Sequence, residues 1–213
     1  MFFTDPPYGV SYQSNMRTVT PKFDVLNNDD KFITGWINLA EKFSQGFVFV
    51  WTSWKVLTEW LTELSPFGSL TNMVVWYKRG GWLGSLTDTY LTDFELCLVY
   101  NRGNELKGKR LGSVWDVNKD NTNSYQHPTQ KPVGLAINAI ETTTNKNAMV
   151  LDLFLGSGST LIAAESTKRI CYGMELDQHY CDVILRRYKK TYPDAQMKCL
   201  TRPDFPFEEL LNA

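Results

Sequence analysis

Hydrophobic positions along the chain recur at two spacings, and these spacings predict strands that alternate with helices. In the first half of the chain, short apolar runs predict strands over 1–4, 47–51, 72–77 and 94–100. Apolar residues at helical spacing predict helices over 31–44 and 54–64. Residues 10–30, which end in a stretch rich in Asn and Asp, predict a long loop.

The second half of the chain repeats the alternation with more regular spacing. The pattern predicts helices over 133–144, 158–167 and 177–190, and strands over 149–153, 169–174 and 196–200. Strands separated by helices pair in parallel, with the helices packed on the faces of the sheet. The expected fold is therefore α/β, with a doubly wound, mainly parallel sheet that is covered on both faces.

The alternating pattern is interrupted once, between residues 101 and 130, where Gly, Asn, Lys and Asp dominate. Such a composition predicts an irregular insertion and not a second folded unit. The 213 residues of the chain suffice for one sizeable core but not for two. We therefore expect a single domain over 1–213, in which the insertion separates a half at 1–100 from a half at 131–213.

Composition narrows the class of protein further. Hydrophobic residues make up 43% and charged residues 21% of the chain, as in ordinary soluble globular proteins. The formal net charge is −1, so any contact with nucleic acid must rest on a local surface. Four widely spaced cysteines and two histidines argue against structural zinc and for reduced thiols in the cytoplasm. No apolar run is long enough to span a membrane, and no secretion signal is present, so we expect neither membrane nor export.

A glycine-rich turn joins the strand predicted at 149–153 to the following helix, with the sequence Asp-Leu-Phe-Leu-Gly-Ser-Gly-Ser-Thr at 152–160. Glycines let the backbone approach a ligand closely, and the start of a helix presents free N–H groups. Three hydroxyl side chains of the turn can cap this helix or bind the ligand: Ser157, Ser159 and Thr160. Leu161 stands where a dinucleotide motif has its third glycine, and no lysine follows as in a phosphate loop.

Glu175 lies nineteen residues after Gly156, at the end of the next predicted strand. A carboxylate at that place can accept hydrogen bonds from both hydroxyls of a ribose. A ribose site without a pyrophosphate site indicates S-adenosylmethionine as the cofactor. A plain strand-turn-helix with a surface glutamate also fits this spacing.

A second group of candidate residues, Asp5-Pro6-Pro7-Tyr8, follows the first predicted strand. An aromatic amine is a poor nucleophile because its lone pair is delocalised into the ring. The Asp5 carboxylate and a rigid carbonyl of the Pro6-Pro7 segment can each accept one amine hydrogen and draw the nitrogen towards tetrahedral geometry. The ring of Tyr8 offers a surface on which a flipped base can stack. A Pro-Pro turn after a strand also occurs for structural reasons alone.

The third candidate segment, His-Pro-Thr-Gln-Lys-Pro at 127–132, closes the insertion and opens a helix. Its prolines are rigid and can orient Thr129 and Lys131 towards the methionine part of the cofactor. A proline at a helix start beside a solvated lysine is the alternative.

Taken together, the three segments resemble the amino-specific DNA methyltransferases that carry their motifs in permuted order, the β group. The order is DPPY, then HPTQKP, then LFLGSGST, and the resemblance extends from residue 1 to about 190. It implies a Rossmann-like methyltransferase fold that uses S-adenosylmethionine, with a short recognition insertion at 101–130. Asp at position 5 is more usual in members of this family that modify adenine, so we expect adenine in DNA as the methyl acceptor.

The resemblance also implies a role for each candidate residue, and no metal. The catalytic residues expected are Asp5, Pro6, Pro7 and Tyr8. The cofactor-binding residues expected are Thr129, Lys131, Asp152, Phe154, Gly156, Ser157, Gly158, Ser159, Thr160 and Glu175.

Two features depart from the family pattern. Only four residues precede Asp5, where family members carry a Gly-Asp strand and a helix. Residues 197–211 are a candidate for that piece moved to the other end; alternatively they are the ordinary chain end of the family, and position 1 is an internal start. The recognition insertion is short, with five basic and three acidic side chains available for phosphate contacts. Methylation of the cytosine amine or of RNA, and a non-catalytic subunit that binds cofactor or DNA, therefore stay open.

The expected partners follow from the same resemblance. Double-stranded DNA is the expected substrate, and a restriction endonuclease is a possible partner. Aromatic residues cluster at 47–54 and at 76–82, which is compatible with a homodimer as well as with core packing.

Overall fold

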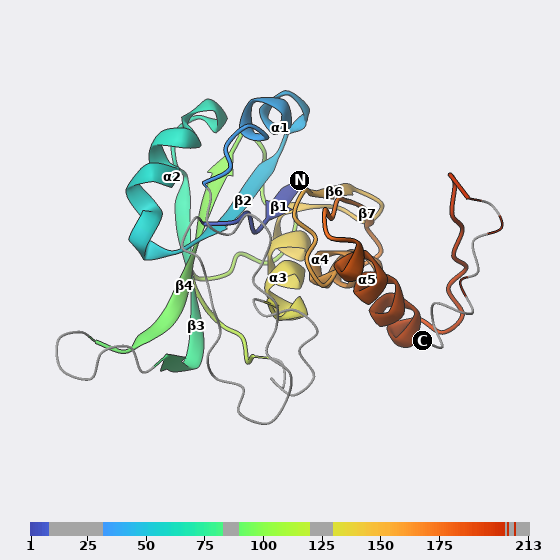
Figure 1. Ribbon diagram of the computed structural model, residues 1–213. Helices are drawn as coiled ribbons and strands as arrows, with labels where there is room; N and C mark the ends of the chain where they lie inside the picture. Colours follow the sequence, from blue (N-terminus) through green and yellow to red (C-terminus); the bar gives the residue numbers. More distant parts are fainter. Residues whose placement is uncertain (9–31, 83–89, 120–129, 203, 205–206, 208–213) are drawn as a thin grey trace.

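The computed structural model describes residues 1–8, 32–82, 90–119, 130–202, 204 and 207. Within these residues, strands form one mixed sheet in the order β5-β3-β4-β2-β1-β6-β7 (Figure 1). The strands are β1 (Phe2–Thr4), β2 (Phe47–Thr52), β3 (Asn72–Trp82), β4 (Thr92–Asn101), β5 (Val114–Asp116), β6 (Met149–Asp152) and β7 (Ile170–Gly173). Only β4 runs antiparallel to its neighbours β2 and β3, so the predicted mainly parallel α/β sheet is confirmed.

Helices pack on both faces of this sheet. They are α1 (Ile37–Phe43), α2 (Leu57–Glu63), α3 (Val133–Thr143), α4 (Ser159–Ser166) and α5 (Gln178–Thr191), with short 3-10 turns η1 (Trp54–Val56) and η2 (Ser65–Phe67). Side chains of β1 alternate between the two faces: Phe2 joins the core under α1 and α2, and Phe3 joins the core under α3 and α4. No helix of the described part is long and apolar enough to cross a membrane.

β1 is central to the architecture although it is only three residues long. It lies between β2 and β6 and pairs in parallel with both, with Phe2 opposite Leu151 of β6. Parallel strands end at the same edge of a sheet, so the segments that follow β1 and β6 emerge side by side. A buried hydrogen bond of 3.0 Å from the Thr4 hydroxyl to Asp152 Oδ1 ties these two strand ends together.

The insertion is more ordered than its composition predicts, because it contains β5. β5 pairs in parallel with β3, and its Trp115 is buried against Phe49 with ring centroids 6.4 Å apart. The expectation of an irregular segment over 101–130 is therefore wrong for 114–116. A single buried tryptophan among small and polar residues provides the packing that stabilises this short strand, whereas residues 120–129 lie outside the described part.

Three other expectations have different outcomes. The helix predicted at 31–44 begins only at Ile37, since Phe32 instead forms an isolated bridge with Tyr8. The strand predicted at 196–200 is wrong: these residues form no strand, and Leu200 is exposed on a segment that projects from the body of the protein (Figure 1). The predicted loop at 10–30 lies outside the described residues.

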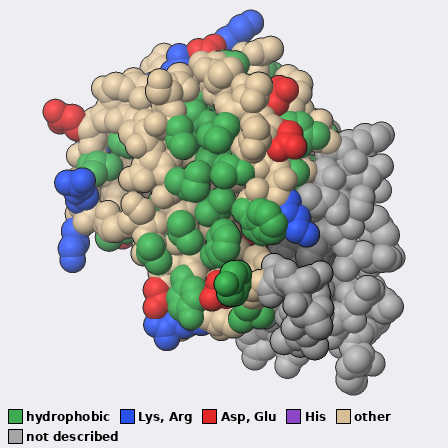
Figure 2. Space-filling model, turned by 90° about the vertical axis from the view of Figure 1, so that its left-hand side faces the viewer, with side chains coloured by type: hydrophobic (Ala, Val, Ile, Leu, Met, Phe, Trp, Pro, Cys, Tyr) green, Lys and Arg blue, Asp and Glu red, His purple; other side chains and the backbone are tan. Residues whose placement is uncertain are grey.

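Exposed apolar side chains gather on the side of the molecule where α2, β3 and β4 lie. Figure 2 looks at that side, and hydrophobic side chains form a stripe across it. Trp54, Leu61 and Tyr77, which belong to elements of this region, are each at least one-third exposed. Nothing in the described structure covers this stripe. The homodimer stays a prediction.

The contact between the insertion and the end of α3 generates a first prediction. The N–H groups of Lys107 and Gly108 both donate to the carbonyl of Thr142, and a Cβ at position 108 would collide with the Glu141 carbonyl oxygen. We expect Gly108→Ala to lower the free energy of unfolding by about 1–3 kcal/mol in urea denaturation. Gly112→Ala is the control, because its Cβ would meet nothing within 4 Å. Equal stabilities of the two variants would contradict this packing.

Candidate active site

Charged side chains from four segments meet beyond the carboxyl end of β1. Lys131, which precedes α3, places its Nζ 2.5 Å from Asp5 Oδ2 and 3.0 Å from Glu95 Oε2. Lys78 of β3 pairs with the other oxygen of Glu95 at 3.0 Å. Two carboxylates and two ammonium groups therefore form one chain of ion pairs, which we call the charged cluster: Asp5, Lys131, Glu95 and Lys78.

Tyr8 completes the surroundings of Asp5. Its hydroxyl donates a hydrogen bond to Asp5 Oδ1, and Lys131 Nζ lies 3.3 Å from the same hydroxyl oxygen. The ring of Tyr8 is 5.8 Å from that ammonium group, within the range of a cation–π contact. Both oxygens of Asp5 thus have a partner from the protein itself.

The ionisation of the charged cluster follows from burial and pairing. Burial raises the pKa of Asp5, although the positive charge of Lys131 opposes that shift. Burial also acts to raise the pKa of Glu95, but Lys131 and Lys78 outweigh it and bring the pKa to about 2. Burial disfavours the charged form of Lys131, yet the two carboxylates raise its pKa above the usual value. Glu95 and Lys131 are therefore both charged at neutral pH.

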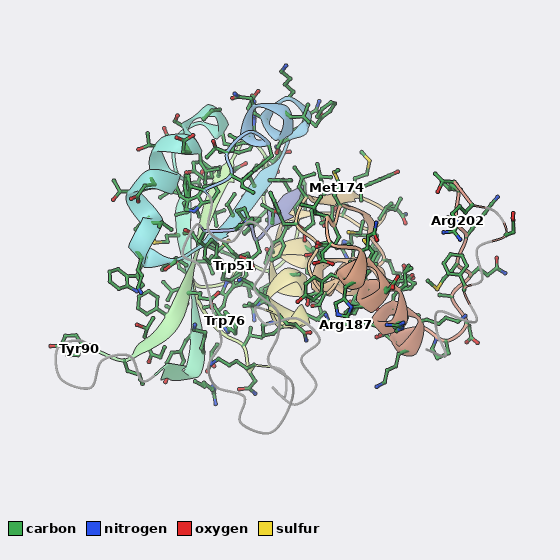
Figure 3. The ribbon with its side chains drawn as sticks, in the orientation of Figure 1. Trp51, Trp76, Tyr90, Met174, Arg187 and Arg202 are labelled. Atoms are coloured by element: carbon green, nitrogen blue, oxygen red, sulfur yellow. The ribbon has the colours of Figure 1, made fainter. Side chains whose placement is uncertain are left out.

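Two tryptophans form the apolar wall of the charged cluster, and Figure 3 labels both. Lys131 Nζ is 5.4 Å from the ring of Trp51, and Lys78 Nζ is 5.9 Å from the ring of Trp76. The two indole rings meet edge to face with centroids 6.3 Å apart. Trp51 and Trp76 are both buried, so they limit access of water to the ion pairs and strengthen them.

The glycine turn after β6 adopts the backbone that its sequence requires. Gly156 has φ +55° and Gly158 has φ +83°, values that residues with a side chain rarely adopt. The N–H of Gly156 donates to Glu175 Oε2 at 2.8 Å, and the N–H of Asp177 donates to Oε1 at 2.9 Å. Glu175 therefore links the glycine turn to the start of α5, and each of its oxygens keeps a lone pair for a further donor.

Asp152 lies at the junction of the two strand ends. It is 3% exposed, and its Oδ1 accepts hydrogen bonds from the Thr4 hydroxyl at 3.0 Å and from the N–H of Phe154 at 3.1 Å. Burial raises the pKa of Asp152 to about 6, against the lowering effect of these hydrogen bonds. Asp152 thus supports the backbone of the turn and is linked directly to the strand that carries Asp5.

Serine hydroxyls hold the turn in place and do not cap α4. Ser159 Oγ donates to the carbonyl oxygen of Lys131 at 2.7 Å. Arg187 lies on α5 and is labelled in Figure 3. Its Nη1 donates to the Ser157 carbonyl and to the hydroxyls of Ser157 and Ser159, each at 3.0 Å. The N-cap residue of α4 is Gly158, without a side-chain hydrogen bond, so of the two roles considered for these hydroxyls, capping is not observed.

The structure brings the candidate residues together as two connected groups. Asp5 and Tyr8 lie with Lys131, and Pro6, which follows Asp5, is buried. Two bonds described above connect this group to the glycine turn: Thr4 to Asp152, and Ser159 to Lys131. Phe154 packs edge to face on Trp36 at 5.9 Å. Thr129 lies outside the described residues, and no cluster of metal ligands is found in the part described.

Sequence reasoning missed three charged residues of the site, Lys78, Glu95 and Arg187. Glu95 lies directly before the apolar run Leu96–Tyr100 of β4, at a position that points to the same face as Trp51. A charged residue on the inward-facing side of this strand was the available signal. Arg187 is one of two adjacent arginines on an amphipathic helix, and nothing in the sequence distinguishes it from a solvated residue.

Comparison with known proteins adds to this geometry. Residues 102–186 match a family model described as DNA methylase. The type II methyltransferase M2.LlaDCHI of Lactococcus lactis subsp. cremoris is 26% identical over 222 residues, covering 89% of this chain and 82% of the relative. M2.DpnII of Streptococcus pneumoniae, also a type II methyltransferase, is 26% identical over 219 residues, covering 88% and 81%.

Solved structures show the same fold. The M1.HpyAVI–SAM complex aligns with a TM-score of 0.64 at 21% identity, over 87% of each chain. The PvuII DNA methyltransferase (cytosine-N4-specific) aligns with a TM-score of 0.60 at 13% identity, over 99% of this chain and 85% of that one. The protein thus has the Rossmann-like fold of these methyltransferases.

The buried carboxyl of Asp152 generates a prediction about pH. Its folded-state pKa of about 6 is above the value of 3.8 for a free side chain, so the folded state holds an extra proton between these values. The stability contributed by Asp152 is full below about pH 4 and is lost as the pH rises towards 6. We expect Asp152→Asn to gain about 2 kcal/mol relative to the wild type between pH 4.5 and pH 7, in denaturation curves without ligand. A difference that does not vary with pH would contradict the buried ionisation.

Proposed function

We propose that this protein is an S-adenosylmethionine-dependent DNA methyltransferase that transfers a methyl group to the exocyclic amine of adenine. The observation that carries the proposal is the pairing of β1 with β6, which sets Asp5-Pro6-Pro7-Tyr8 beside the glycine turn. The match to the DNA methylase family model and the type II methyltransferase relatives support DNA amino-methylation.

The glycine turn provides what an adenosine-containing cofactor needs. Positive φ at Gly156 and Gly158 gives the turn its sharp bend, and Glu175 keeps a free lone pair on each oxygen for ribose hydroxyls. Lys131 and Thr129 stay predicted contacts for the methionine end. When bound, S-adenosylmethionine supplies an electrophilic methyl group on its sulfonium.

The residues after β1 then act on the target base. The Asp5 carboxylate and a carbonyl of the Pro6-Pro7 segment accept the two amine hydrogens and turn the nitrogen lone pair towards the methyl group. Tyr8 stacks on the flipped base. Because burial raises the pKa of Asp5, its carboxylate is a stronger hydrogen-bond acceptor than an exposed aspartate. The new C–N bond would form as the methyl–sulfur bond breaks, and the methylated nitrogen, then positively charged, would release one of its hydrogens as a proton to water.

The choice of adenine over cytosine rests on Asp at position 5. The family model covers both kinds of amine, and the PvuII neighbour is described as cytosine-N4-specific, so neither comparison favours adenine. The base itself must therefore be identified from the product. Double-stranded DNA as substrate, a restriction endonuclease as partner, a homodimer and a cytoplasmic location are further expectations of the same proposal.

Removal of the Asp5 carboxylate tests the catalytic proposal. We expect Asp5→Ala to reduce methyl transfer to DNA by at least about 10²-fold while cofactor binding is retained, because the amine loses an acceptor but the glycine turn is unchanged. Transfer is measured with labelled cofactor and mixed-sequence DNA, with RNA in parallel. Asp194→Ala, at an exposed position far along the chain, is the control.

The products of the same assay are digested to nucleosides. N6-methyladenine supports the proposal, whereas N4-methylcytosine or label on RNA alone would contradict the stated acceptor. Full activity of Asp5→Ala would remove the proposed role of Asp5. A wild-type protein that binds cofactor and DNA without transfer would identify a non-catalytic subunit.

Glu175 is tested by binding and not by turnover. We expect Glu175→Gln to weaken S-adenosylmethionine binding at least tenfold in calorimetry, because hydrogen bonds to a charged acceptor contribute about 1.5–3 kcal/mol. Glu63→Gln, an exposed site on α2, controls for the loss of one negative charge. An unchanged dissociation constant for Glu175→Gln would contradict the assignment of the ribose site.

A further inference from the structure

Glu95 is a charged residue that lies outside both the glycine turn and the Asp5-Pro6-Pro7-Tyr8 segment. It lies on β4 opposite Trp76, and Leu96 and Cys97, which follow it, are buried. Its two oxygens have separate partners, Lys78 on Oε1 and Lys131 on Oε2, each at 3.0 Å. A carboxylate held by two ammonium groups inside an apolar wall requires an explanation, because burying charge is costly.

Lys131 is shared between Glu95 and Asp5. Its side chain is 10% exposed, and its ammonium group lies 2.5 Å from Asp5 and 3.0 Å from Glu95. If Glu95 were neutral, the positive charge of Lys131 would act on Asp5 alone, and Lys78 would lose its ion pair with Glu95. The arrangement of two carboxylates and two ammonium groups avoids both consequences.

This sharing matters because Lys131 lies against one oxygen of Asp5. Tyr8 donates to Oδ1 and Lys131 contacts Oδ2, so each oxygen keeps one lone pair, and an amine hydrogen reaches Oδ2 more easily when Lys131 lies closer to Glu95. Lys131 can move away from Asp5 only if another anion is close enough to hold it. Glu95 is such an anion, and Lys78 keeps it charged and in place.

We propose that Glu95 is a positioning residue of the methyltransferase: it holds Lys131 between two carboxylates and so keeps Asp5 available to the target amine. The proposal rests on the proposed function, since it assigns to Glu95 a role through Lys131 on Asp5. Glu95 itself contacts neither base nor cofactor in this scheme.

The kinetic test uses Glu95→Gln, which keeps the size of the side chain and removes its charge. We expect kcat to fall at least tenfold, with the KM for DNA and the affinity for S-adenosylmethionine within about twofold of the wild type. The acidic limb of kcat/KM for DNA should move to lower pH, because Asp5 loses a negative neighbour and gains the whole charge of Lys131. A fall in rate that is equal at every pH would indicate a structural role and would overturn the proposal.

Glu41→Gln is the matched control. Glu41 also forms an ion pair, with Arg102 at 2.6 Å, but at the opposite end of the sheet from Asp5. The substitution is chemically the same, so its rate and pH profile should equal those of the wild type. An equal effect of Glu41→Gln would mean that the charge change itself, and not the position of Glu95, causes the result.

A titration without cofactor or DNA separates this inference from the proposed function. Carboxyl carbon shifts of Asp5 are followed by NMR across pH in the wild type and in Glu95→Gln. A lower titration midpoint for Asp5 in the variant supports the positioning role even if no methyl transfer is detected. An unchanged or higher midpoint would overturn it even if methyl transfer is confirmed.

A second variant keeps the test decisive if Glu95→Gln does not fold. Glu95→Gln combined with Lys78→Gln removes one carboxylate and one ammonium group, so the charged cluster stays balanced. Asp5 should titrate at a lower pH in this double variant as well, because Lys131 then pairs with Asp5 alone. A wild-type midpoint in the folded double variant would contradict the proposal.

Discussion

Parallel pairing of β1 with β6 is the constraint on which the rest of the structure depends. It joins positions 148 residues apart through the bond from Thr4 to Asp152, and it does so inside the core, where a misplaced polar group would be costly. The pair fixes the distance between the Asp5 segment and the glycine turn before any ligand is bound. A site assembled in this way needs little rearrangement of its backbone, since both segments leave adjacent strands at one edge.

Two further contacts make the site rigid on the side of the turn. Glu175 accepts hydrogen bonds from N–H groups of the turn and of the start of α5. Arg187 of α5 donates hydrogen bonds to the two serine hydroxyls of the turn. On the other side, Lys131 is held through its carbonyl by Ser159 and through its ammonium group by Asp5 and Glu95. The same lysine therefore connects the backbone of the glycine turn with the charged cluster.

Much of this arrangement could be predicted from the sequence, because the motifs are local and the strands are strongly apolar. The spacing of hydrophobic residues located β1, β2, β6 and the helices around them, and the glycines identified the turn. The contacts of Glu95 and Arg187 could not be predicted, since their partners are distant in the sequence. β5 was missed because one tryptophan stabilises it, and 196–200 was wrongly expected to pair although its residues have no core to cover.

The two tryptophans that flank the charged cluster have a practical consequence. An indole close to an ammonium group emits light whose intensity and wavelength depend on that charge, and Trp51 lies 5.4 Å from Lys131 in a dry environment. A shift of the lysine by a fraction of its present distance would alter that emission. Trp51 is therefore a native optical reporter of the charged cluster; because the chain has seven tryptophans, its emission is isolated as the difference between the wild type and a Trp51→Phe variant.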